Sequence, residues 1–139
     1  MGIIVDTSVL VAAERQRFDL DGLLATVGEG TAAIAAITAS ELLHGVEHAR
    51  EPVVRAERLR NTEDVFDSFA VIPFGLAEAR IHANVWAALA AKGRMIGAHD
   101  LLVAATAIAI GAAVATLNQK DFKRVPGLAL APVAKFVKA

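Results

Sequence analysis

Short apolar runs alternate with longer amphipathic or charged stretches along this chain, and that alternation limits the fold more than any other feature. Residues 3–5, IIV, form a continuous β-branched run that is too short for a helix and predicts a buried strand. Further strands are expected at residues 31–37, 69–72, 113–117 and 128–130, and helices at residues 9–15, 20–27, 38–49, 52–67, 76–91 and 100–110. Such alternation implies a parallel sheet covered on both faces. We therefore expect an α/β fold, a three-layer α/β/α sandwich with a central parallel sheet of four to five short strands, and a single domain over residues 1–139.

Local signals mark several helix boundaries. Thr7 or Ser8 is expected to cap the first helix. The segment Thr38-Ala39-Ser40-Glu41 has the S/T-x-x-E spacing of a capping box, which places a helix start at Thr38. A turn is expected at residues 28–30, GEG.

Composition narrows the class of protein without deciding its partner. Residues 101–119 carry no charge, but polar residues and Gly111 interrupt them, so we expect a buried helix followed by a strand and no membrane span. No signal peptide is evident, and the absence of cysteine fits a reducing cytoplasm, which is the expected location. The formal net charge of −1 gives no global attraction to nucleic acid.

Three of the 15 acidic residues stand in apolar surroundings: Asp6 after IIV, Glu41 before two leucines, and Asp100 before LLVAATAIAI. An ionised carboxylate loses several kcal/mol on burial unless another group compensates it. In a parallel sheet, ligands gather outside the carboxyl ends of the strands, and these acids are expected to converge there. Convergent carboxylates protonate or bind a cation, and oxygen ligands select Mg²⁺ or Mn²⁺.

Each acid also has a simpler interpretation. Glu41 could complete the capping box, and Asp100 could be a first-turn acid that the helix dipole stabilises. Asp6 gains little as a cap, so its position is the hardest to explain without a cation. Asn118 and Asp121 follow the predicted strand at residues 113–117, where Asn118 could supply a neutral oxygen ligand or form an Asx turn.

Four segments, in order, resemble the sequence blocks of PIN-domain nucleases, particularly the VapC toxins of bacterial toxin–antitoxin pairs: VDTSVLV, TASELLHG, AHDLLVAATA and ATLNQKDFKRVPGL. The resemblance covers residues 3–128. It places Asp6, Glu41 and Asp100 on the family's acidic positions. The fourth position falls on Asn118, where many members carry Asp, so the resemblance leaves Asp121 to share that role.

The resemblance implies a PIN-like fold and an Mg²⁺-dependent endoribonuclease, the toxin of a type II toxin–antitoxin pair, with Mn²⁺ as a plausible substitute. It also implies an RNA substrate, a cognate VapB-type antitoxin and a homodimer. Asp6 and Asp100 are the expected metal ligands, with Glu41 orienting or deprotonating the attacking water. The hydroxyl groups of Thr7, Ser8 and Thr116 are expected to fix the carboxylates.

Rival interpretations remain open at this point. The segment HGVEH, residues 44–48, matches a zinc-peptidase pattern, although no third ligand is evident. A phosphatase with Asp6 as nucleophile normally needs a second Asp where Ser8 stands, and a receiver domain needs an acidic pair that is not clear here. A metal-free RNA-binding or interaction module is the non-enzymatic alternative.

A partner groove is expected between the helices that contain Leu42 and Pro52, because their apolar residues exceed what a small core needs. These residues could instead pack on each other or form a homodimer interface. The expected groove residues are Leu43, Val46, Val53, Val54 and Leu59.

Overall fold

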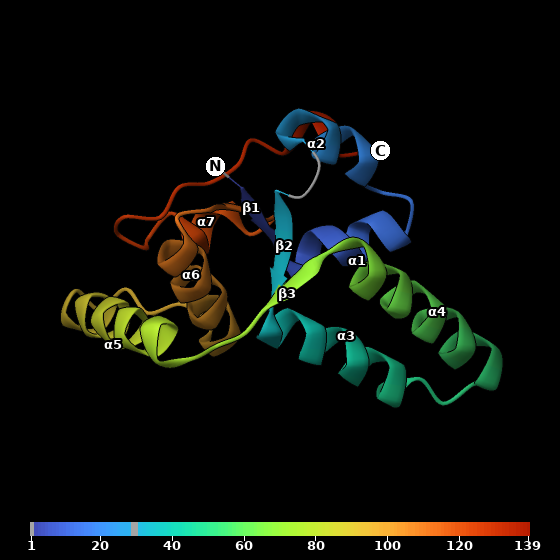
Figure 1. Ribbon diagram of the computed structural model, residues 1–139, viewed down its shortest axis with the longest axis horizontal. Helices are drawn as coiled ribbons and strands as arrows, with labels where there is room; N and C mark the ends of the chain where they lie inside the picture. Colours follow the sequence, from blue (N-terminus) through green and yellow to red (C-terminus); the bar gives the residue numbers. More distant parts are fainter. Residues whose placement is uncertain (1, 29–30) are drawn as a thin grey trace.

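The computed structural model describes residues 2–28 and 31–139, so most of the turn expected at residues 28–30 lies outside the described residues (Figure 1). The strands are β1 (Ile3–Val5), β2 (Ala32–Ala35), β3 (Ala70–Ile72) and β4 (Ala113–Ala115). The helices are α1 (Thr7–Glu14), α2 (Leu20–Val27), α3 (Ala36–His48), α4 (Pro52–Ser68), α5 (Leu76–Ala91), α6 (Ala98–Ile110), α7 (Gln119–Phe122) and the 3₁₀ helix η1 (Ala134–Phe136).

The four strands form a parallel sheet in the order β3-β2-β1-β4. The register pairs Ile4 of β1 with Ala33 of β2 on one side and with Val114 of β4 on the other. Because successive strand residues point to opposite faces, Ile4 and its neighbours Ile3 and Val5 enter different cores. The expected parallel sheet of four to five strands is therefore confirmed, with four strands.

Helices cover both faces of the sheet and complete three layers (Figure 1). The core around Ile4 takes side chains from α5, α6 and α7, including Leu89, Val103 and Phe122. The core around Ile3 and Val5 takes side chains from α1 and α2, with partly buried residues of α3 and α4 packed against it. The expected α/β/α sandwich is confirmed.

Two expected helix caps are wrong. The helix α3 begins at Ala36, directly after β2, so Thr38 lies inside the helix with its Oγ1 buried and without a hydrogen-bond partner among the described residues. Glu41 does not form a capping box with Thr38, because α3 follows β2 directly and begins two residues before Thr38. Likewise α1 begins at Thr7 and Asp6 takes the capping position without a side-chain cap, so neither Thr7 nor Ser8 caps α1.

The ends of three other predicted elements also shift. The helix α6 begins at Ala98, which puts Asp100 in its first turn rather than at its start. The strand β4 ends at Ala115, so Thr116 follows the strand. The fifth strand expected at residues 128–130 is reduced to a single parallel bridge between Val114 and Leu130.

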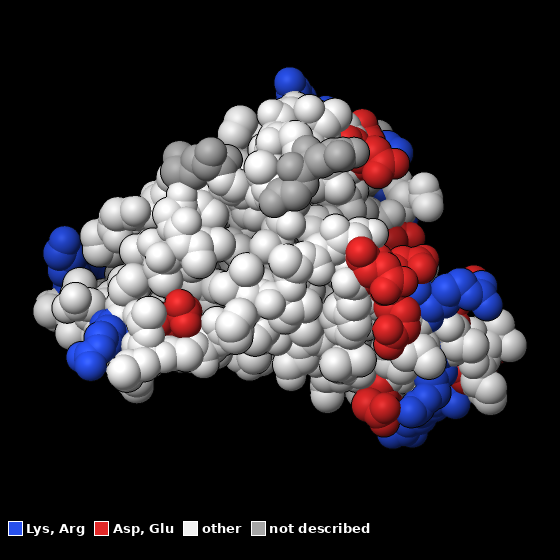
Figure 2. Space-filling view, in the orientation of Figure 1, with Lys and Arg blue, Asp and Glu red and all other residues white. Residues whose placement is uncertain are grey.

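Charged side chains are unevenly distributed over the face shown in Figure 2. Acidic and basic side chains lie together on the side where Figure 1 shows α3 and α4, while the centre of this face is largely uncharged. Among residues 2–28 and 31–139, no helix combines the length and hydropathy needed to cross a membrane.

Candidate active site

Asp6 stands at the carboxyl end of β1, and its backbone N–H donates to the Ala115 carbonyl at 2.9 Å. Its side chain is buried, with only 5% of the residue exposed. One carboxylate oxygen, Oδ2, accepts hydrogen bonds from Ser8 Oγ at 2.8 Å and from Thr116 Oγ1 at 2.7 Å. Two hydroxyl donors therefore compensate part of the desolvation of this carboxylate and fix its orientation.

Thr116 connects the ends of β1 and β4. The residue is fully buried, and its Oγ1 accepts a hydrogen bond from the Asn118 backbone N–H at 3.0 Å while it donates to Asp6. Ser8 Oγ lies 3.3 Å from Thr116 Oγ1 and accepts from the Leu117 backbone N–H at 3.0 Å. The two hydroxyl groups thus bind Asp6 to the backbone that follows β4.

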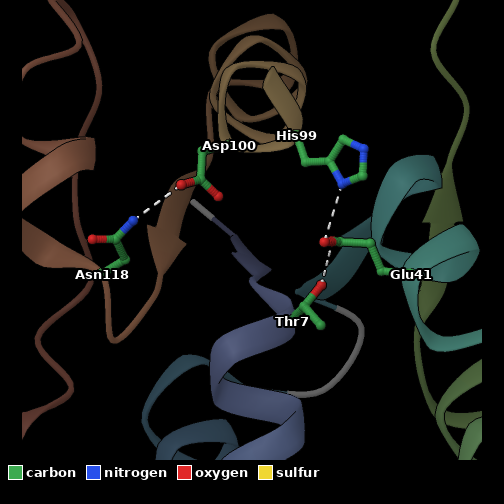
Figure 3. A network of polar contacts seen from close by, with 5 residues as sticks. All are labelled: Thr7, Glu41, His99, Asp100 and Asn118. Atoms are coloured by element: carbon green, nitrogen blue, oxygen red, sulfur yellow. Dashed lines mark hydrogen bonds and ion pairs between the residues drawn. The ribbon is translucent and has the colours of Figure 1, made fainter. Parts of the chain in front are cut away.

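Glu41 reaches the site from the second turn of α3 and contacts two other elements (Figure 3). Its Oε1 accepts from Thr7 Oγ1 at 2.7 Å, and its Oε2 lies 3.2 Å from His99 Nδ1 on α6. His99 was not among the residues expected from the sequence. Its partner is 58 residues away in the chain, and the only available signal was its position next to Asp100.

Asp100, Asn118 and Asp121 form the opposite side of the site. The Nδ2 group of Asn118 donates to Asp100 Oδ2 at 3.0 Å, a contact drawn in Figure 3, and to Asp121 Oδ2 at 3.1 Å. Asn118 thus bridges two carboxylates as a hydrogen-bond donor, and its side chain does not cap α7. Arg124 Nη1 lies 4.0 Å from the other oxygen of Asp121.

Three neighbouring carboxylates affect the ionisation of Asp100. Burial raises the pKa of Asp100, and the negative charges of Asp6, Asp121 and Glu41 raise it further. The hydrogen bond from Asn118 opposes this increase in pKa because it favours the ionised carboxylate. The protein therefore holds several negative groups close to one another at the carboxyl ends of β1 and β4.

The donor set fits a small divalent cation in its chemistry. Mg²⁺ prefers oxygen ligands, usually takes one or two carboxylates and keeps several waters. Asp6 at the carboxyl end of β1 and Asp100 in the first turn of α6 offer two such carboxylates. Within residues 2–28 and 31–139, no three acidic or histidine side chains close around a single point, so a fully protein-made cage is not the arrangement here.

The zinc-peptidase pattern on α3 has a different geometry. The rings of His44 and His48 stack with their centroids 6.0 Å apart, and both residues are exposed on the helix surface. Among the described residues no third histidine or acidic group joins them as a metal cluster. Stacked, exposed rings without a third ligand give no support to a zinc hydrolase site.

Comparison with known proteins identifies relatives along almost the whole chain. The family model described as "PIN domain" matches residues 3–128. Ribonuclease VapC of Rickettsia bellii (strain RML369-C) is 40% identical over 128 residues, which cover 92% of this chain and 93% of the relative. Ribonuclease VapC1 of Rickettsia felis is 39% identical over 137 residues, with 96% of this chain and 98% of the relative covered.

A solved structure agrees with the sequence relatives. The structure described as VapBC2 from Rickettsia felis bound to a DNA fragment from their promoter superimposes with a TM-score of 0.82 at 29% identity, covering 94% of this chain and 98% of that chain. Fold, sequence and the order of the acidic residues lead to the same assignment. The chain belongs to the PIN-domain family, and within that family to the VapC proteins.

Proposed function

We propose that this chain is an Mg²⁺-dependent endoribonuclease and the toxin of a type II toxin–antitoxin pair, with Mn²⁺ able to replace Mg²⁺. The observation that carries the proposal is the position of Asp6, Glu41 and Asp121 around the partly buried Asp100: burial raises the pKa of Asp100, and the negative charges of these three residues raise it further. A sheet edge that only stabilised the fold would gain nothing from three carboxylates that oppose the ionisation of a fourth. The relatives' name, ribonuclease VapC, supports RNA as the substrate.

Asp6 and Asp100 are the residues that would hold the metal. When bound there, Mg²⁺ supplies an acidified water and neutralises charge on the phosphoryl group. The hydroxyl groups of Ser8 and Thr116 keep Asp6 Oδ2 in a fixed direction, which leaves its second oxygen as the one available to a ligand. Asn118 restrains Asp100 in the same way through Oδ2.

Glu41 is positioned to orient and deprotonate the attacking water. Thr7 and His99 each contact a different oxygen of its carboxylate, which limits rotation of the side chain. A general base needs hydrogen-bond reach to the proton it removes, and a carboxylate fixed from two sides meets the geometric part of that requirement. Asp121 is held by Asn118 and accepts a more distant contact from Arg124, so its role is secondary.

A protein partner is also part of the proposal. The structural relative is a VapBC complex, and an active ribonuclease requires restraint in its own cell. A basic side chain from a VapB-type antitoxin would be attracted to the acidic site and would compete with the cation. A homodimer is proposed from the family resemblance.

The proposed partner groove needs one correction. Val46 is only 4% exposed and packs inside the protein, so its place in a docking surface is wrong. Leu43, Val53 and Leu59 are exposed by 42%, 70% and 44%. Together with the half-buried Val54, they are the remaining candidates on α3 and α4. An amphipathic helix of the antitoxin would bind such a surface through its apolar face.

The decisive test is cleavage of single-stranded RNA by purified protein with Mg²⁺, with Mn²⁺ or with EDTA. We expect cleavage with either metal, none with EDTA, and none in the Asp100→Asn variant. Binding of RNA without cleavage under all three conditions would favour the metal-free RNA-binding module. Cleavage unchanged by EDTA would exclude the metal mechanism.

A further inference from the structure

A pocket of roughly 220 Å³, lined by residues of α1, α3 and α4, opens beside the acidic site. Its walls include Thr7, Val11, Glu41, Leu42, Gly45 and Arg58. Thr7 and Glu41 belong to the acidic site as well as to the pocket wall. The hydroxyl of Thr7 donates to Glu41 at 2.7 Å. A group bound in this pocket would therefore lie next to the acidic site.

Arg58 places a partly buried cation in this pocket. Its Nη1 donates to the Gly45 carbonyl at 3.1 Å, which fixes the guanidinium against α3. A guanidinium has five N–H donors, so most of them remain after this contact. In the described ranges, 2–28 and 31–139, Arg58 forms no ion pair, whereas Arg55 one turn earlier pairs with Glu47 at 3.0 Å.

Gly45 is a glycine that the fold itself does not require. It lies inside α3, where glycine is less favourable than alanine. Its backbone is not in the left-handed region, and a Cβ built on it would meet nothing within 4 Å. Neither conformation nor packing explains the missing side chain, and the effect of the glycine is to leave space in the pocket wall.

The chemistry of the walls selects the kind of ligand. The wall combines apolar side chains with donors and an acceptor: Val11 and Leu42 are apolar, and Arg15 and Arg58 are hydrogen-bond donors. Glu14 is an acceptor, and its Oε1 accepts a hydrogen bond from Asn61 Nδ2 at 3.2 Å. The carboxylate of Glu14 would repel a phosphate group, so a site for a phosphate alone would not have this side chain in its wall. A nucleobase has apolar faces together with donors and acceptors on its edge, and proteins recognise unpaired RNA bases by stacking and by contacts to those edges.

We propose that this pocket holds one unpaired nucleobase of the RNA, adjacent to the scissile phosphodiester bond, with Arg58 donating to the edge of the base. The proposal rests on the ribonuclease function proposed above and names a subsite for its substrate. Gly45 keeps the pocket open, and Thr7 and Glu41 connect it to the reacting phosphate.

The first experiment separates pocket filling from loss of folding. Affinity for a fluorescent single-stranded oligoribonucleotide is measured in EDTA, alongside the melting temperature. We expect Gly45→Ala to raise the melting temperature by about 2–4 °C, because alanine favours the helix. Gly45→Leu should fold at least as stably as the native chain yet bind RNA about tenfold more weakly, with Gly45→Ala in between. Unchanged affinity in a stable Gly45→Leu variant would overturn the proposal.

The second experiment tests base recognition with a matched control. A library of randomised oligoribonucleotides is cleaved, and the base preference beside the cut is read by sequencing. We expect a preference at one position that Arg58→Gln reduces at least fivefold and Arg55→Gln leaves in place. A base preference that Arg58→Gln and Arg55→Gln change to the same extent overturns the pocket. A native chain that neither binds nor cleaves RNA instead overturns the proposed function, and the pocket with it.

Discussion

Replacement of Thr116 by valine removes one hydroxyl from the centre of the site and leaves the shape of the side chain nearly unchanged. Three contacts of the hydroxyl disappear: the 2.7 Å bond to the Asp6 carboxylate, the 3.0 Å bond from the Asn118 backbone N–H, and the weaker 3.3 Å contact with Ser8 Oγ. A hydrogen bond to a charged group contributes about 1.5–3 kcal/mol, and an unpaired backbone N–H in a partly buried place costs about 1 kcal/mol. We therefore expect the free energy of unfolding to fall by about 2.5–4 kcal/mol.

The assay is urea and thermal unfolding in EDTA, so that metal binding does not contribute. For a domain of this length, the expected loss corresponds to a melting temperature lower by about 10–16 °C. Thr116→Ser is the matched control, because it keeps the hydroxyl and loses one buried methyl group, at a cost of about 1 kcal/mol. A valine variant within about 0.5 kcal/mol of the native chain, or more stable than the serine variant, would refute the hydrogen-bond role assigned to Thr116.

Three further predictions concern Asp100, Asp121 and Leu59. Folding raises the pKa of Asp100 from about 3.8, so its ionisation opposes folding: the native free energy of unfolding falls as pH rises through that range. Asp100→Asn should therefore be more stable than the native chain at pH 7 in EDTA, by less than about 1 kcal/mol because the group is partly exposed, and the gain should vanish in acid. A constant difference across the pH range would contradict this assignment. Asp121→Ala should reduce cleavage less than Asp100→Ala in single-turnover assays, because Asp121 follows the strand end by a turn; equal losses would make Asp121 a direct metal ligand. Leu59→Glu should weaken co-purification with the antitoxin at least tenfold without lowering the melting temperature, and an intact complex would place the groove elsewhere.

Three of the acidic side chains of the site, Asp6, Glu41 and Asp100, could be predicted from sequence because each stands beside apolar residues. Asp6 and Asp100 adjoin apolar runs that must be buried, and that conflict is visible without a structure. The alternation of strands and helices likewise predicted the three layers. These features depend on local residue order, which a sequence displays directly.

The contacts that organise the site could not be predicted in this way. Glu41 has the spacing of a capping box, but its partners are Thr7 and His99, 34 and 58 residues away. Those contacts depend on the residue at which α3 begins. This residue is Ala36, because α3 follows β2 without a loop between them. The donor role of Asn118 also depends on the approach of Asp100 and Asp121 from two different elements.

The central claim is that Asp6 and Asp100 form a divalent-cation site on this sheet edge. The most direct test is a calorimetric titration of Mn²⁺ into metal-free protein, compared with Asp6→Asn and Asp100→Asn and with Glu47→Gln as an acidic control outside the site. We predict saturable binding to the native chain and to Glu47→Gln, with affinity reduced at least tenfold in each site variant. Equal affinity in all four proteins, or no saturable binding to the native chain, would contradict the claim.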